Sequence, residues 1–250
     1  MLRFFKLRPF SLSLFFFLAL IPASGESNVT TGIDGNKSTT NMEFTDTSLP
    51  ASKSLAYVIP IKDQIGPPIL DILRRGLKDA IRENAQIVIL DMDTPGGELG
   101  VTLEIMEEII ESLEKFEGKI ITYVNDEAIS AGAYIAIATS EIAFAPNSQI
   151  GAAEAVSGGG ANIDSSMKRK INSYLKAKIR NYAGGHRYRS IIMSAMMDAN
   201  ESLLIEGEPL KAQDGSLIKK SGELLTLTGE EACKEYGEPP APLLGFEVFD

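Results

Sequence analysis

Apolar positions along the middle of the chain follow two alternating patterns, which together predict an α/β fold. Short apolar runs predict strands at 55–61, 87–90, 119–124 and 142–145. The run at 87–90 lacks polar alternation, as expected of a strand that is covered on both faces. Between the runs, apolar residues recur every three or four positions and predict helices at 67–81, 99–113 and 130–139. Alternating strands and helices favour repeated βαβ units with a parallel sheet and right-handed crossovers.

The second half of the chain is richer in turns. A glycine-rich loop at 157–160 precedes a long helix predicted from Asp164 to Tyr182, with a shorter helix near 191–199. A turn-rich hairpin is expected at 207–222. Thr228 and Glu231 have the spacing of a capping box for a final helix that Gly237 would end.

The N-terminus has the pattern of a secretory signal. Three basic residues among the first eight precede an apolar run from Phe10 to Ile21, and the small residues Ala23 and Gly25 follow it. We therefore expect residues 1–25 to be a signal peptide that directs export to the periplasm or the extracellular space. The apolar run is shorter than the roughly 20 residues of a membrane span. An uncleaved anchor that keeps the protein membrane-associated stays open as the alternative.

Composition divides the rest of the chain into three parts. Residues 26–53 are rich in Ser, Thr, Asn and Gly and predict a disordered linker, since they bury too little apolar surface to offset their chain entropy. Residues 54–237 form the expected globular domain. Residues 238–250 are proline-rich and are expected to be a loose tail.

Charge and cysteine content exclude two classes of protein. Of the 24 basic and 34 acidic residues, three basic and no acidic ones lie in the leader, which leaves 21 against 34 and a net charge of −13. Such a surface repels phosphate backbones, so nucleic acid is not an expected partner. The one cysteine, Cys233, excludes an intramolecular disulfide.

Two short segments carry the candidate chemistry, and each stands between a predicted strand and a predicted helix. They are Asp93-Thr94-Pro95-Gly96-Gly97 and Ser130-Ala131-Gly132-Ala133-Tyr134. Ligand sites in open α/β sheets lie beyond the carboxyl ends of the strands, where both segments are expected. A serine beside free helix N–H groups can attack a carbonyl, and N–H groups of glycine can approach the oxygen closely. Taken singly, the first segment is an ordinary turn and Ser130 an ordinary N-cap.

The segments and their order identify a resemblance. A strand, DTPGG, a helix, a second strand, SAGAYIA and then IAFAPNSQIGAA resemble the N-terminal domain of the NfeD (nodulation-efficiency protein D) family, from about Tyr57 to Tyr236. That domain is similar to signal peptide peptidase A and belongs to the ClpP/crotonase-like fold class, with a long helix after a glycine-rich loop. The resemblance implies that Ser130 is the nucleophile and that Gly96, Gly97 and Ala131 form the oxyanion hole. It implies no metal or cofactor.

The catalytic base is assigned by the resemblance alone. NfeD-like peptidases pair the serine with a lysine near the start of the long helix, which corresponds to Lys170. The helical spacing places Ile171, Tyr174, Leu175, Ile179 and Tyr182 on one apolar face, with Lys170 at its flank and Lys168 and Lys178 near it. A solvated lysine is the alternative. His186, the single histidine, would have to lie near Ser130 to complete a triad.

Three functions follow as hypotheses. The leading one is an exported serine endopeptidase of Ser/Lys type that cleaves hydrophobic peptide segments of membrane-associated proteins, with a stomatin-like membrane protein as the partner that the resemblance implies. The second is a catalytically inactive protein of the same fold that binds such segments or serves as a scaffold. The third is a crotonase-type acyl-CoA enzyme, which export disfavours. A homo-oligomer stays open.

Overall fold

The computed structural model describes residues 55–156 and 164–248. The predicted signal peptide, linker and glycine-rich loop lie outside these residues. The helices are α1 (Pro67–Arg82), α2 (Leu99–Lys115), α3 (Ala131–Ile137), α4 (Ser165–Tyr182), α5 (Arg189–Met197) and α6 (Gly229–Cys233). The strands are β1 (Ala56–Lys62), β2 (Ile87–Thr94), β3 (Lys119–Ile129), β4 (Glu141–Phe144), β5 (Gln149–Gly151), β6 (Leu204–Ile205), β7 (Glu208–Pro209), β8 (Thr226–Thr228), β9 (Glu235–Tyr236), β10 (Ala241–Pro242) and β11 (Phe246–Glu247).

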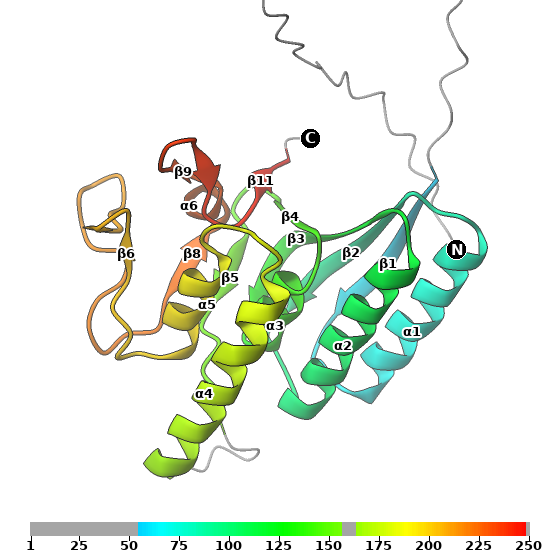
Figure 1. The fold of residues 1–250 in the computed structure, drawn as a ribbon, viewed down its shortest axis with the longest axis horizontal. Helices are drawn as coiled ribbons and strands as arrows, with labels where there is room; N and C mark the ends of the chain where they lie inside the picture. Colours follow the sequence, from blue (N-terminus) through cyan, green and yellow to red (C-terminus); the bar gives the residue numbers. More distant parts are fainter. Residues whose placement is uncertain (1–54, 157–163, 249–250) are drawn as a thin grey trace, which may run out of the picture. The chain divides into compact units, whose positions relative to one another are not determined.

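A mostly parallel sheet organises the domain. Its strands follow the order β1-β2-β3-β4-β11, and β5 pairs with the far end of β3 and, antiparallel, with β8. Each of the first three parallel steps is a βα unit read directly along the chain (Figure 1). The predicted α/β class of repeated βαβ units is therefore confirmed.

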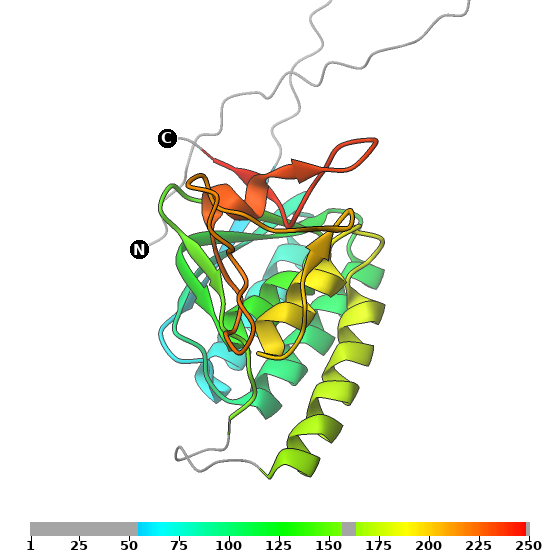
Figure 2. The same ribbon diagram turned by 90° about the vertical axis from the view of Figure 1, so that its left-hand side faces the viewer.

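The helices gather on one side of this sheet. Helices α1, α2 and α3 pack there, and α4 lies on the outside of this layer beside α5 (Figures 1 and 2). Helix α1 begins at Pro67, where the absent N–H of proline costs no hydrogen bond. Its buried residues recur at helical spacing; they are Ile69, Leu70, Leu73, Leu77 and Ala80. Within the described ranges, no helix combines the length and the apolar character that crossing a membrane requires.

The second face of the sheet is less covered than the sequence suggests. In β2 the residues that face the helices are buried, whereas the alternate residues are only half-buried. On β1, Val58 is 53% exposed. The expectation that 87–90 is covered on both faces was wrong, because apolar side chains on the open face mask the alternation that a half-covered strand would otherwise show.

The C-terminal region departs most from the sequence prediction. The expected loose tail instead forms β10, which pairs with β9, and β11, which pairs in parallel with β4. The capping box of Thr228 and Glu231 is present, but the helix that it starts ends at Cys233 rather than at Gly237. The hairpin expected at 207–222 is formed earlier, by β6 and β7, and 210–222 contains only one isolated bridge, Lys211 to Leu217.

Candidate active site

Ser130 lies at the junction between β3 and α3, as the sequence predicts. It is the N-cap residue of α3, and its backbone adopts φ 54° and ψ −111°. Its N–H donates to the carbonyl of Gly151 at the end of β5, over 2.9 Å. A non-glycine residue with such angles lies outside the well-populated regions and stores roughly 1–3 kcal/mol of strain, which proteins tolerate mainly at functional sites. The strained turn leaves the Ser130 side chain only partly buried.

The Gly96–Gly97 turn packs directly against this serine. A Cβ added at Gly96 would lie 2.6 Å from Cβ and 3.0 Å from Oγ of Ser130, and Gly96 has φ +115°. A Cβ at Gly97 would lie 2.1 Å from the carbonyl oxygen of Ile65. Both positions therefore require glycine, one for the approach of Ser130 and one for the bridge to the chain before α1.

Two backbone N–H groups beside the serine have no acceptor among the residues that the structure describes. The carbonyl of Gly96 accepts from Ile65 and the N–H of Glu98 donates to Ile65, so the intervening N–H of Gly97 is directed away from that segment. The N–H groups of Gly97 and Ala131 donate to no group within residues 55–156 and 164–248. Such a pair has the donor chemistry of an oxyanion hole.

Thr94 supports both halves of the site, a role that the sequence analysis did not assign. Its side chain is fully buried, and its Oγ1 donates to the carbonyl of Asp63 over 2.5 Å while it accepts from the N–H of Gly96 over 3.2 Å. A Cβ at Gly132 would lie 2.7 Å from its methyl group. The hydroxyl thus holds the glycine turn and the methyl contacts the serine helix. The sequence signal that could have identified this role is the position of Thr94 in the DTPGG segment, two residues before Gly96.

The long helix presents its lysines differently from the expected phase. Its buried residues are Asn172, Leu175 and Ile179, whereas Tyr174, expected on the apolar face, is 53% exposed. Lys170 is exposed, and within the described part of the chain it forms no hydrogen bond with Ser130. Lys168 lies one turn before Asn172 and is partly buried. Its Nζ is 2.7 Å from Oε1 of Glu154, three residues beyond β5.

The remaining lysines of α4 are held by carboxylates. Lys178 pairs with Glu107 of α2, and this hydrogen bond raises the pKa of its ammonium although partial burial opposes the shift. Burial lowers the pKa of Lys176, but Glu201 and Asp198 outweigh burial and leave it raised. Neither amine has the lowered pKa that a general base requires near pH 7.

His186 and the acids near the strand ends have other contacts. The Nε2 atom of His186 is 2.9 Å from the carbonyl oxygen of Ser140, beyond the C-terminal end of α3, whereas Ser130 stands at its N-terminal end. Seven helical residues, roughly 10 Å, separate the two ends, so the structure does not bring a Ser-His pair together. Asp91 pairs with Lys62 and accepts from Asn125.

Known proteins with similar sequences are membrane proteins. The chain is 37% identical over 118 residues to membrane protein NfeD1b of Bacillus subtilis. The matched region is 47% of this chain and 26% of that protein. It is 34% identical over 110 residues to the membrane-bound protease PH1510 of Pyrococcus horikoshii, covering 43% of this chain and 24% of that protein. The matches thus span about a quarter of the length of these curated relatives.

Solved structures of similar fold are peptidase domains. A serine-to-alanine mutant described as the 1510-N membrane-bound stomatin-specific protease aligns with a TM-score of 0.58 and 27% identity, over 80% of this chain and 82% of that one. A lysine-to-alanine mutant of the same protease in complex with a substrate peptide aligns equally well, over 77% of its length. These alignments confirm the α/β peptidase-domain fold that the sequence predicts. The family described as "NfeD1b, N-terminal domain" matches residues 55–239, and the chain therefore belongs to this family.

Proposed function

We propose that this chain is a serine endopeptidase of Ser/Lys type, with Ser130 as nucleophile. The observation that carries the proposal is the contact between Ser130, in a strained backbone conformation, and the Gly96–Gly97 turn. The two N–H groups of Gly97 and Ala131 beside that contact are the proposed oxyanion donors. Removal of one such donor typically lowers kcat about 100- to 1,000-fold.

The proposed reaction needs one proton acceptor throughout. The Oγ of Ser130 attacks the peptide carbonyl while its proton passes to a neutral lysine amine, and the carbonyl oxygen gains charge against the two N–H groups. The resulting ammonium then gives this proton to the leaving amine as the C–N bond breaks. Water then attacks the acyl-enzyme while the lysine takes its proton, and the lysine returns that proton to the Oγ of Ser130 as the acid product leaves.

Two lysines of α4 compete for the role of base. Lys170 is our first assignment, which rests on the resemblance. Lys168 is the rival, because it lies on the inward side of α4 and its partner Glu154 follows the strand that receives the Ser130 N–H. Lys170 can act only if the first turns of α4 rotate toward Ser130 when substrate binds. Lys168 can act only if its ion pair with Glu154 opens, because a base must be neutral.

Substrate and location are part of the same proposal. A relative is named as specific for stomatin and has been solved with a substrate peptide. We propose that this chain likewise cleaves hydrophobic segments of membrane-associated proteins, with a stomatin-like protein as partner. Export by the N-terminal signal would place it in the periplasm or outside the cell.

Labelling with a serine-reactive fluorophosphonate tests the nucleophile and the base together. We expect wild type to label at pH 7 and Ser130→Ala not to label. Of Lys170→Ala and Lys168→Ala, only the variant that lacks the base should lose labelling, and Arg180→Ala on the same helix is the matched control. Equal labelling of wild type and Ser130→Ala would refute the proposed nucleophile.

A catalytically inactive binding protein is the second candidate. The exposed position of Lys170 favours it, since among the described residues no lysine forms a hydrogen bond with Ser130. The two candidates differ in one measurement. An inactive protein would bind a hydrophobic peptide with the same affinity before and after Ser130→Ala, and wild type would neither label nor cleave it.

A further inference from the structure

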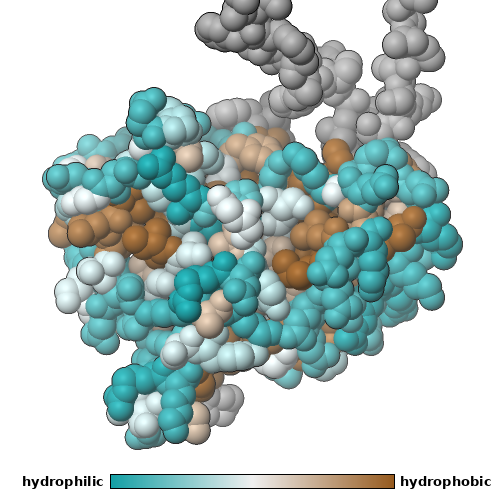
Figure 3. Space-filling view, viewed as in Figure 1, coloured by the Kyte–Doolittle hydropathy of each residue, from teal (hydrophilic) through white to brown (hydrophobic). Residues whose placement is uncertain are grey.

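Helix α4 forms a basic strip on an acidic protein. The whole chain has a formal net charge of −10, yet the 18 residues of α4 include no carboxylate. Its cations are Lys168, Arg169, Lys170, Lys176, Lys178 and Arg180. The surface along α4 is mostly hydrophilic in the space-filling view (Figure 3). A local positive field on a negatively charged surface selects for an anionic partner.

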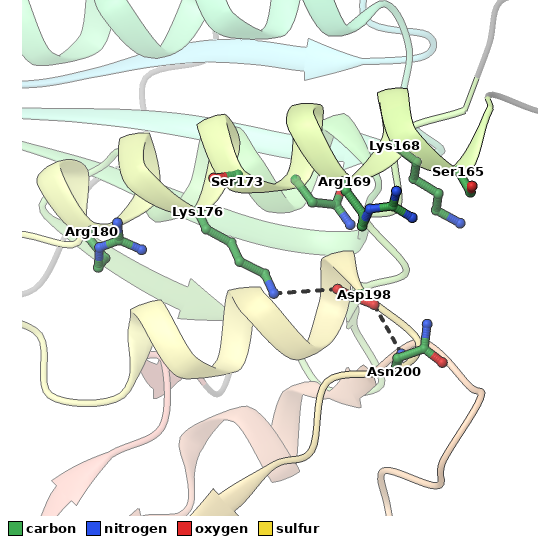
Figure 4. A pocket seen from close by; sticks show the side chains of 9 residues that line it. Ser165, Lys168, Arg169, Ser173, Lys176, Arg180, Asp198 and Asn200 are labelled. Atoms are coloured by element: carbon green, nitrogen blue, oxygen red, sulfur yellow. Dashed lines mark hydrogen bonds and ion pairs between the residues drawn. The ribbon is translucent and has the colours of Figure 1, made fainter.

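A groove of about 570 Å³ follows this strip. Lys168, Arg169, Lys176 and Arg180 line it from α4, and Asp198 and Asn200 line it from the segment after α5 (Figure 4). Arg169 and Arg180 are eleven residues apart, which is three helical turns, so they lie on one stripe roughly 16 Å apart. An extended polypeptide covers that distance with about five residues.

Internal ion pairs occupy only some of these cations. Lys168 pairs with Glu154, and Lys176 pairs with Asp198 and Glu201. Arg169 and Arg180 are exposed, and neither has a carboxylate partner within 55–156 or 164–248. A guanidinium presents a planar fork of N–H donors that fits a carboxylate. The two ends of the groove therefore offer open carboxylate sites.

The floor of the groove contains an unsatisfied amide. Asn172 lines the groove and is 8% exposed, and its Oδ1 is buried with no hydrogen-bond partner among the described residues. A buried acceptor without a donor costs about 1–3 kcal/mol. A small rotation of the amide toward the groove would let it accept from a ligand N–H. A polypeptide supplies such donors, whereas a phosphodiester offers acceptors only.

The groove also starts close to the candidate nucleophile. The carbonyl of Gly151 accepts from Ser130, and Glu154, three residues further, pairs with Lys168 in the groove. Three residues span at most roughly 10 Å. A polypeptide held in the groove can therefore continue to Ser130 without a long detour.

We propose that the groove between α4 and the end of α5 is an exosite for an acidic polypeptide segment, whose carboxylates pair with Arg169 and Arg180. That the bound segment belongs to a substrate rests on the proposed peptidase function. The binding itself does not, because Arg169 and Arg180, which hold the carboxylates, take no part in the proposed chemistry. The exosite would select substrates that carry an acidic stretch beside the hydrophobic segment that is cut.

The test measures binding without cleavage. Full-length Ser130→Ala protein is titrated by fluorescence anisotropy into two labelled peptides, which are identical except that one has Glu and the other Gln at two positions five residues apart. We expect the Glu peptide to bind about five- to tenfold more tightly at low salt, and this preference to shrink at about 0.3 M salt because exposed pairs are screened. The double variant Arg169→Gln/Arg180→Gln should abolish the preference.

A matched double variant controls for net charge. Arg75→Gln/Arg82→Gln also removes two positive charges, here from exposed positions on α1, and should keep the preference for the Glu peptide. The proposal is overturned if both peptides bind equally, or if the α1 variant loses as much as the α4 variant. It is also overturned if Arg169 and Arg180 are needed for binding anionic lipid vesicles but not the Glu peptide. If wild type cleaves no peptide and the preference for the Glu peptide is still present, the peptidase function is removed and the exosite stays.

Discussion

Replacing Thr94 by valine would remove one hydroxyl from beneath the Gly96–Gly97 turn and leave the shape of the side chain unchanged. The hydrogen bond to the Asp63 carbonyl, which lies near the surface, contributes about 1 kcal/mol, and the buried Gly96 N–H left without an acceptor costs about 1–3 kcal/mol. We therefore expect Thr94→Val to lower the free energy of unfolding by about 2–4 kcal/mol. For a domain of this size that corresponds to a fall in Tm of about 5–15 °C.

The same change should act on catalysis through the position of the Gly97 N–H. A turn that is no longer held at Gly96 places this donor less accurately, and we expect kcat to fall about 10- to 100-fold, less than complete loss of a donor would cause. KM should change little, because the donor acts on the transition state. Steady-state cleavage of a fluorogenic hydrophobic peptide, measured well below the Tm of each variant, gives both constants.

Thr94→Ser separates the hydroxyl from the methyl group. Serine keeps both hydrogen bonds and loses only the methyl that contacts Gly132, at about 1 kcal/mol of stability. Its kcat should stay within about threefold of wild type. If Thr94→Ser loses as much kcat as Thr94→Val, or if Thr94→Val keeps wild-type kcat, then the hydroxyl does not position the oxyanion turn.

Three further predictions concern the same domain. Gly96→Ala should abolish fluorophosphonate labelling, because its Cβ would lie 2.6 Å from Ser130 Cβ and φ +115° is strained for alanine; a variant that labels normally would contradict the packing. Ser130→Gly should have a Tm about 2–8 °C above Ser130→Ala, since glycine relieves roughly 1–2 kcal/mol of left-handed strain; equal Tm values would show that the strain is absent. Burial, and after it the charge of Arg189, lower the pKa of His186, so the free energy of unfolding should decline as pH falls from 6.5 through that lowered pKa. His186→Gln should flatten this decline. An NMR titration that gives His186 a pKa above 6.5 would refute the prediction.

The early βα units could be predicted from sequence because the apolar pattern of each element lies within its own residues. The helix from Pro67 repeats its apolar period over many residues, and the strand at Ile87 begins as a continuous apolar run, so each can be recognised from its own residues. Strands β5 and β11 have three and two residues. Their pairing depends on distant segments, which no local period can report.

The site was predictable in part for the same reason. Ser130 and the glycines stand at strand ends that the alternation locates, and glycine signals close backbone approach. Which face of α4 is buried could not be predicted, because the polar Asn172 is buried where the apolar pattern predicted Tyr174. One misplaced residue rotates the expected face and changes which lysine points inward.

The parallel pairing of β11 with β4 also bears on how the protein behaves in solution. β11 is the last strand of the sheet on that side and covers the part of the β4 edge at Ala143 and Phe144, whose backbone groups would otherwise be open. An uncovered edge of this kind is a template for strand pairing between molecules. Shortening the protein before Phe246 would therefore expose β4 and favour self-association, even though Ser130 and the glycine turn would keep all their contacts.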